Sequence, residues 1–199
     1  MFASAVISIA LAAGALAVPA ALSARQDPCN ALGAGSSSSL TYNFQLEVVD
    51  PSAQDSATGA VLALVDSESD GLWWLKEIHQ NATGDFNGWQ LNGGALIPQL
   101  SSTTQGLVGS DMPVGAGSIV EFAVTNNGSA NAGAGQTPYC AVSDADGDAT
   151  IAVNGDANSF SVCQTPSLAW VLVYSASGDN DGAYAYDTCT AQKVHAVRA

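Results

Sequence analysis

Hydrophobic and polar residues alternate most regularly between Leu40 and Val48. Every second residue of this stretch is apolar, and the residues between them are Thr, Asn, Gln and Glu. A period of two predicts a β-strand with one buried face. Shorter apolar runs predict further strands over residues 60–65, 72–78, 86–91, 95–97, 118–125, 149–154, 159–163, 168–175, 183–186 and 193–197.

Turn-forming residues separate these segments. Gly stands beside Asn or Asp at positions 70–71, 87–88, 92–94, 127–128, 154–156 and 181–182, and these residue types favour the tight turns that join antiparallel strands. Many short strands with such turns predict an all-β fold, a single-domain antiparallel β-sandwich or barrel stabilised by disulfides. No long stretch repeats apolar residues with the helical period, so we expect little helix. Regions 101–117 and 128–137 are expected to be surface loops.

The N-terminal residues predict export from the cell. Residues 2–24 carry no charge and consist mainly of Ala, Leu, Val and Ile, which is typical of a secretory signal peptide. The small residues of Ala15-Leu16-Ala17 predict cleavage after residue 17, and a later cut, up to residue 25, is the alternative. A signal anchor also stays open, because the apolar run approaches the roughly 20 residues that span a bilayer. Residues 18–39 are then an extension and linker, and residues 40–199 are the β domain.

Charge restricts the partners. The chain of 199 residues has 18 acidic and 4 basic side chains, which gives a formal net charge of −14. Phosphate backbones and anionic lipids would be repelled, so we expect neither nucleic acid nor membrane as a partner. Apolar residues make up 47% and charged residues only 11%, which excludes intrinsic disorder.

Four cysteines follow the predicted signal peptide: Cys29, Cys140, Cys163 and Cys189. An even number in a secreted chain predicts two disulfides, and four cysteines allow three connectivities. We favour the nested pairing of Cys29 with Cys189 and of Cys140 with Cys163, which would tie the two ends of the domain together. No CxxC motif is present, so a zinc or redox role is not expected.

Two kinds of polar loop carry candidate sites. Asn81 and Asn127 begin Asn-x-Ser/Thr sequons, which accept N-glycans on exposed loops. Asp144, Asp146 and Asp148 place three carboxylates within five residues. Such crowding is unfavourable unless the group is solvated or a cation bridges it. The alternatives are therefore a calcium-binding turn and an exposed acidic loop.

Tryptophans are the candidate ligand-binding residues. Trp73 and Trp74 are adjacent in a predicted strand, so they point to opposite faces and only one can enter the core. An exposed indole ring is a platform on which a sugar ring can stack. Trp73 and Trp89 are the candidates for this role. In the alternative interpretation, Trp74, Trp89 and Trp170 only pack within or at the edge of the sheet.

No catalytic residue is predicted. The only imidazoles are His79 and His195, and the chain lacks the Gly-x-Ser-x-Gly motif, so a nucleophilic triad is not expected. A carboxylate pair for glycoside hydrolysis stays open, because the separation that defines it is spatial. Glu47, Glu77 and Glu121 lie in predicted strands and are the acids to inspect.

A family resemblance rests on a series of short motifs: Trp89 to Leu96, Tyr139-Cys140, Phe160 to Cys163, Val171 to Tyr174, and Cys189. In this order they resemble small secreted fungal cell-wall proteins of the phialide-development type. More distantly, they resemble the C-terminal cysteine domain of yeast wall proteins with internal repeats. The resemblance implies a non-enzymatic extracellular protein.

These observations predict a secreted, non-catalytic structural or interaction protein of the fungal cell surface or wall. A carbohydrate-binding module is the first alternative, and a glycosidase with paired carboxylates is the second. The expected partners are a wall polysaccharide or another wall protein. No cofactor is expected, although the acidic loop leaves calcium open.

Overall fold

The computed structural model describes residues 28–52, 59–69, 72–78, 86–100, 107–126, 137–143 and 148–199. Within these ranges the chain forms a short 3₁₀ helix, η1 (Pro28–Leu32), and thirteen β-strands. The strands are β1 (Ser36–Ser37), β2 (Phe44–Val49), β3 (Ala60–Ser69), β4 (Leu72–Ile78), β5 (Phe86–Asn92), β6 (Ala95–Leu100), β7 (Leu107–Asp111), β8 (Glu121–Asn126), β9 (Tyr139–Val142), β10 (Ala149–Val153), β11 (Phe160–Gln164), β12 (Trp170–Tyr174) and β13 (Ala185–Arg198). The predicted all-β class is confirmed.

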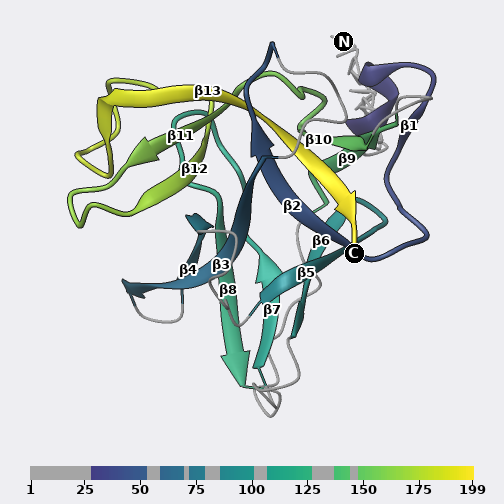
Figure 1. Ribbon diagram of the computed structural model, residues 1–199, viewed down its shortest axis with the longest axis horizontal. Coiled ribbons are helices and arrows are strands. Elements are labelled where there is room, and N and C mark those ends of the chain that lie inside the picture. Colours follow the sequence, from purple (N-terminus) through teal and green to yellow (C-terminus); the bar gives the residue numbers. More distant parts are fainter. Residues whose placement is uncertain are drawn as a thin grey trace, which may run out of the picture.

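Six of these strands close into an antiparallel barrel. Their order is β2, β3, β4, β12, β11 and β13, and β13 pairs again with β2. Closure depends on the length of β13, which pairs with β11 through its first half and with β2 over Lys193–Arg198. Figure 1 shows this strand in yellow, crossing the molecule from β11 to β2. The sequence predicted two short strands here, but residues 185–198 form one strand, whose pairing with β11 shifts register between Val162 and Gln164.

The barrel interior is apolar because inward positions alternate along each strand. Leu46 lies opposite Leu62 of β3 and Ala196 of β13, and all three side chains are fully buried. Val162 of β11 lies opposite Leu172 of β12 in the same way. Burial of these side chains supplies the main stabilisation of the fold.

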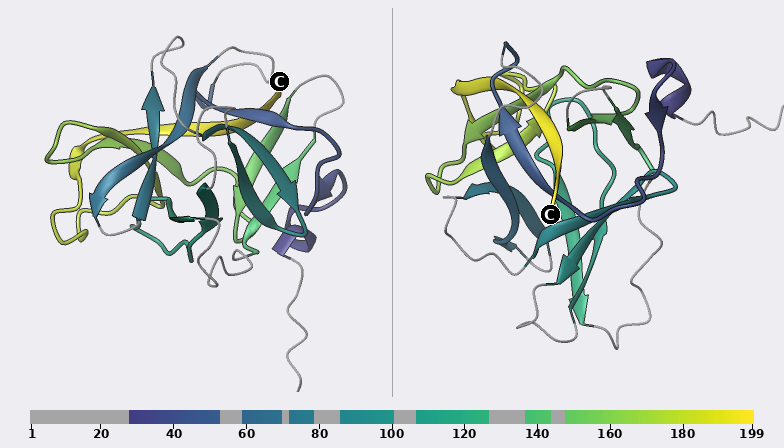
Figure 2. Two further views of the ribbon diagram at one scale, coloured as in Figure 1. Left: turned by 90° about the horizontal axis from the view of Figure 1, so that it is seen from below. Right: turned by 45° about the vertical axis from the view of Figure 1, so that its right-hand side comes forward.

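Three groups of strands extend the barrel outward. The β5–β6 hairpin pairs with β2 and β3, the β7–β8 hairpin pairs with β4, and β9 and β10 join β13. Figures 1 and 2 show the β7–β8 hairpin projecting from the barrel and β9 and β10 lying close to η1. The expectation of a loop over 101–117 was wrong for residues 107–111. They form β7 because residues 122–126 lie beside them, a long-range pairing that overrides weak local propensity.

The disulfides join Cys29 to Cys140 and Cys163 to Cys189. All four cysteines are bonded as predicted, but the nested pairing was wrong. Cys29 lies on η1, beside β9 with Cys140, and their Cα atoms are 5.5 Å apart. Cys163 and Cys189 lie on the paired strands β11 and β13. A disulfide forms only between cysteines whose Cα atoms lie within roughly 7 Å. The pairing therefore depends on which elements lie side by side in the fold, and not on the order of the cysteines in the sequence. Two disulfides indicate folding in an oxidising compartment.

Candidate functional site

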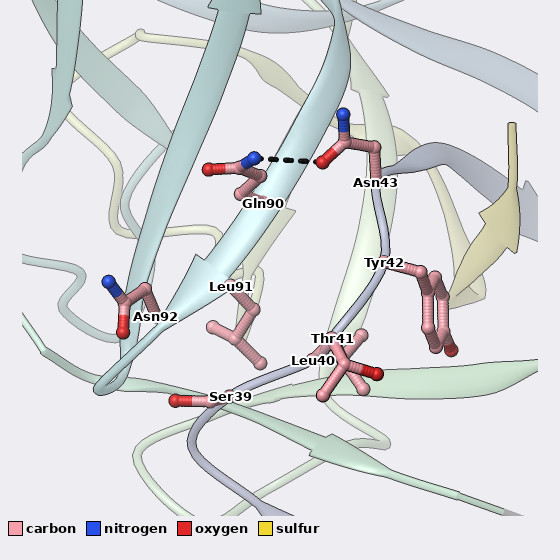
Figure 3. A pocket seen from close by; sticks show the side chains of 8 residues that line it. All are labelled: Ser39, Leu40, Thr41, Tyr42, Asn43, Gln90, Leu91 and Asn92. Atoms are coloured by element: carbon pink, nitrogen blue, oxygen red, sulfur yellow. Dashed lines mark hydrogen bonds between the residues drawn. The ribbon is translucent and has the colours of Figure 1, made fainter.

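An open groove lies between residues 39–43, which lead into β2, and the end of β5 (Figure 3). Its volume is about 210 Å³, and its lining comprises Ser39, Leu40, Thr41, Tyr42, Asn43, Gln90, Leu91 and Asn92. Backbone bonds hold the leading segment beside β5. The Leu40 amide donates to the Leu91 carbonyl (3.0 Å), and the Gly94 amide donates to the Ser38 carbonyl (2.7 Å). The groove is therefore formed by an irregular segment with a bend at Thr41 and Tyr42 on one side and by β5 on the other.

The chemistry of this groove is polar and uncharged. Across it the Gln90 amide donates to Asn43 Oδ1 at 2.8 Å, the bond drawn in Figure 3. Its lining contains no Asp, Glu, His, Lys, Arg or Cys. Tyr42 points away from Gln90, and the Arg198 guanidinium carbon lies 4.2 Å from the centre of its ring. Through these amides and the hydroxyls of its lining, the groove can exchange hydrogen bonds with a neutral ligand.

Trp73 and Trp74 point to opposite faces of β4, as the sequence predicted. Trp73 is half-buried and packs on the main core, with its ring edge-on to Phe86 at 5.7 Å. Trp74 packs in a second cluster on the other face. Its Nε1 donates to Glu121 at 3.0 Å, and Lys76 Nζ lies 5.3 Å from the ring centre. Both indoles of this pair therefore have structural contacts.

Trp89 and Trp170 have opposite surroundings. Trp89 is fully buried, 5.2 Å from the ring of Phe122, so no face of its indole is accessible to a ligand. Trp170 is the first residue of β12 and is 41% exposed. The sequence interpretation placed Trp170 among the packing residues, and the structure makes it the tryptophan best placed to meet a ligand.

Two of the three candidate carboxylates, those of Glu47 and Glu121, accept hydrogen bonds from other groups of the protein. Glu47 is 7% exposed and accepts a hydrogen bond from the Gly59 amide at 2.8 Å. It lies opposite His195, which is fully buried, across the β2–β13 pair. Glu121 accepts the bond from Trp74, whereas Glu77 is exposed on β4. Glu47 and Glu121 therefore stabilise the fold from different strands.

The remaining candidates fall mostly outside the described residues. These are Asn81, Asn127, Asp144 and Asp146; Asp148 is described and lies half-buried directly before β10. The described ranges contain no group of three His, Cys, Asp or Glu residues placed to hold a metal ion.

Among the described residues, one carboxyl group and one phenol group have displaced pKa values. The side-chain hydroxyl and the backbone amide of Ser52 both donate to Asp50 and lower the pKa of its carboxyl. Burial raises the pKa of Tyr174, and the charge of Asp156 adds to this effect. None of these groups lines the groove.

Comparison with known proteins gives no match. No protein-family model, no curated protein and no solved structure matches this chain. Among the described residues, no helix has the length and apolar character needed to cross a bilayer. The groove, the exposed aromatic residues and the disulfides are therefore the features of this chain that bear on its function.

Proposed function

We propose that the protein is a secreted, non-catalytic structural or interaction protein of a fungal cell surface or wall. The observation that carries this proposal is the lining of the groove, which offers amides, hydroxyls and apolar groups but no carboxylate, imidazole, amine or thiol. The two disulfides and the signal-like N-terminus support an extracellular location. The resemblance to fungal wall proteins supports the same role.

Fractionation of a fungal culture producing the full chain tests this role. We expect the protein in the medium or the wall fraction, with its thiols protected from alkylation until a reductant is added. We also expect no release of reducing sugar from β-glucan, chitin or mannan. Recovery from the cytosol with four alkylatable thiols would contradict the location. Sugar release that is lost in Glu47→Gln would contradict the non-catalytic role.

Carbohydrate binding is the second candidate, and the exposure of Trp170 favours it. An exposed indole offers a flat apolar face with a polar edge, which suits a sugar ring. Pull-down with insoluble chitin, β-glucan and mannan tests this candidate. Retention on none of the three polymers would remove it.

Calcium binding by Asp144, Asp146 and Asp148 is a further part of the proposal that rests on the sequence. Calcium at about 100 times its dissociation constant would add about 2.7 kcal/mol to the free energy of unfolding. Asp146→Ala should abolish this gain. A melting curve unchanged by millimolar calcium would leave these residues as a solvated turn.

Removal of N-glycans from Asn81 and Asn127 by a glycosidase should lower the mass of the secreted protein.

A further inference from the structure

One end of the barrel presents an exposed tryptophan beside polar side chains. Among the described residues, the large hydrophobic side chains classed as exposed are Leu168 (73%), Trp170 (41%) and Tyr186 (54%). Leu168 lies on the β11–β12 turn, Trp170 is the first residue of β12, and Tyr186 is the second residue of β13. Figure 1 shows β11, β12 and the start of β13 together on one side of the molecule. In the described part of the chain, the large exposed apolar side chains therefore come from neighbouring elements.

Strand register places Glu77 beside Trp170. Val171 of β12 pairs with Lys76 of β4 in an antiparallel ladder. Trp170 and Glu77 are the next residues toward the same end, so they face each other. Because side chains alternate along a strand, both point to the face opposite that of Val171 and Lys76. This is the inward face of the barrel, since Leu172 shares it.

The neighbouring strand adds an amide to the same rim. Gln164, the last residue of β11, pairs with Trp170 on one side and with Ala185 of β13 on the other. Opposed residues share a face, so Gln164 and Trp170 point the same way. With neighbouring strands about 4.8 Å apart, the set from Glu77 to Gln164 spans roughly 10 Å. We call Glu77, Trp170 and Gln164 the barrel rim.

The turn before Trp170 is held firmly by hydrogen bonds. The Thr165 amide donates to the Ala169 carbonyl (2.8 Å), and the Ala169 amide donates to Thr165 Oγ1 (3.1 Å). Leu168 adopts a positive φ of 65° within this turn. On the other side, the disulfide of Cys163 fastens β11 to β13 next to Gln164. Because these bonds fix the backbone around Gln164 and Trp170, little backbone conformational entropy is lost there on binding.

We propose that the barrel rim binds a neutral polysaccharide of β-linked, equatorially substituted pyranose units. The C–H face of such a ring packs on the Trp170 indole, while its hydroxyls donate to Glu77 and exchange hydrogen bonds with the Gln164 amide. In the described part of the chain, no protein hydrogen bond or ion pair engages these three side chains. The net charge of −14 favours a neutral over an anionic polymer. This inference rests on the proposed extracellular, non-catalytic role.

Titration calorimetry on the full secreted chain tests the rim, with laminarin oligosaccharides, chitin oligosaccharides and α-mannan as separate probes. The first two probes distinguish glucose from N-acetylglucosamine units, and α-mannan is the negative probe because its axial hydroxyl interrupts the ring face. We expect saturable binding of at least one β-linked probe. Trp170→Ala should weaken it by about tenfold or more, which corresponds to about 1.4 kcal/mol. Gln164→Ala and Glu77→Gln should weaken it less.

Tyr186→Ala is the matched control. Tyr186 is more exposed than Trp170, but it follows Ala185 directly and so points to the other face, where its ring lies against Gly178. We expect this variant to bind as the wild type does. Trp170→Phe keeps an aromatic ring and should retain intermediate affinity, which separates stacking from any folding defect of Trp170→Ala. Circular dichroism checks the fold of each variant.

Three results would overturn the proposal: no binding of either β-linked probe, unchanged affinity in Trp170→Ala, or an equal loss in Tyr186→Ala. Binding is measured by calorimetry and not by tryptophan fluorescence, because Trp170→Ala removes the most exposed tryptophan and with it part of the fluorescence signal. Failure of the rim is distinguishable from failure of the proposed role. A wild-type protein that fractionates with the wall but binds no glycan keeps the role and loses the site. A protein that is recovered from the cytosol but binds laminarin through Trp170 would keep the binding site and contradict the proposed extracellular role.

Discussion

Removal of the Cys163–Cys189 disulfide should lower the free energy of unfolding by about 3.5 kcal/mol. This follows from the chain-entropy model, since the two cysteines are 26 residues apart in sequence. Both lie on strands of the closed barrel, so the two strands separate only when the barrel itself unfolds. The full loss of loop entropy should therefore appear in the global transition.

The perturbation is the double variant Cys163→Ala/Cys189→Ala, which leaves no unpaired thiol at this site. For a domain of this size, about 3.5 kcal/mol corresponds to a fall in melting temperature of roughly 7–14 °C. Urea denaturation followed by tryptophan fluorescence gives the free energy directly.

The variant Cys29→Ala/Cys140→Ala is the comparison. Its cysteines are 111 residues apart, which gives an upper value of about 4.8 kcal/mol. The measured loss should be smaller, because without this disulfide η1 can detach from β9 while the rest of the domain stays folded, and the folded state then gains entropy as well.

Peptide mapping checks the connectivity on which these values depend. A protease that cleaves before aspartate places the four cysteines on separate peptides, 27–49, 111–143, 156–178 and 187–199. Without reduction, the first two should be recovered linked to each other, and likewise the last two. Recovery of 27–49 linked to 187–199 would refute the pairing and the strand neighbourhood behind it. A fall of less than about 1 kcal/mol in the Cys163→Ala/Cys189→Ala variant would instead refute the entropy argument.

Three further predictions follow from the core, one buried hydroxyl and the net charge. Leu172→Ala should cost about 2–5 kcal/mol in urea denaturation, because its side chain is 2% exposed inside the barrel; an effect below about 1 kcal/mol would contradict its place in the core. Tyr184→Phe removes the hydroxyl that accepts from the Ser177 amide (2.9 Å) and donates to the Gly117 carbonyl (3.1 Å). This should cost about 1–3 kcal/mol and accelerate amide exchange at Ser177, whereas unchanged exchange would argue against the bond. At low salt the melting temperature should be higher near about pH 4.5 than near about pH 7.5, because acid reduces the repulsion behind the net charge of −14. The lowered pKa of Asp50 does not reverse this sign, because its contribution is present above the unfolded value of 3.8 and is lost only below it. A melting temperature that rises with pH would mean that paired carboxylates outweigh the repulsion.

Local patterns in the sequence predicted most of the strands but not their neighbours. The alternation from Leu40 to Val48 identified β2, although the strand begins only at Phe44, and the apolar run 72–78 coincides with β4. The opposite orientations of Trp73 and Trp74 also follow from local alternation alone. Barrel closure depends instead on pairing between β13 and two strands distant in sequence. The same pairing decides which cysteines meet, so linear spacing was a poor guide to the disulfides.

The exposure of each tryptophan depends on register along the barrel, and this explains why the sequence named Trp73 and Trp89, and not Trp170, as the candidates for ligand binding. Trp89 follows a turn signal, but its pairing with Phe44 draws it into the core. Around Trp170 both faces of the strand are apolar, because Leu172 packs in the barrel and Val171 packs in the outer cluster. The sequence pattern of β12 therefore shows no polar face from which the exposure of Trp170 could be predicted. Trp170 is exposed because it is the first residue of β12, at the open end of the ladder with β11 and β4. A register shift of two residues would keep its face and bury its ring, so a test of Trp170 is also a test of the strand register.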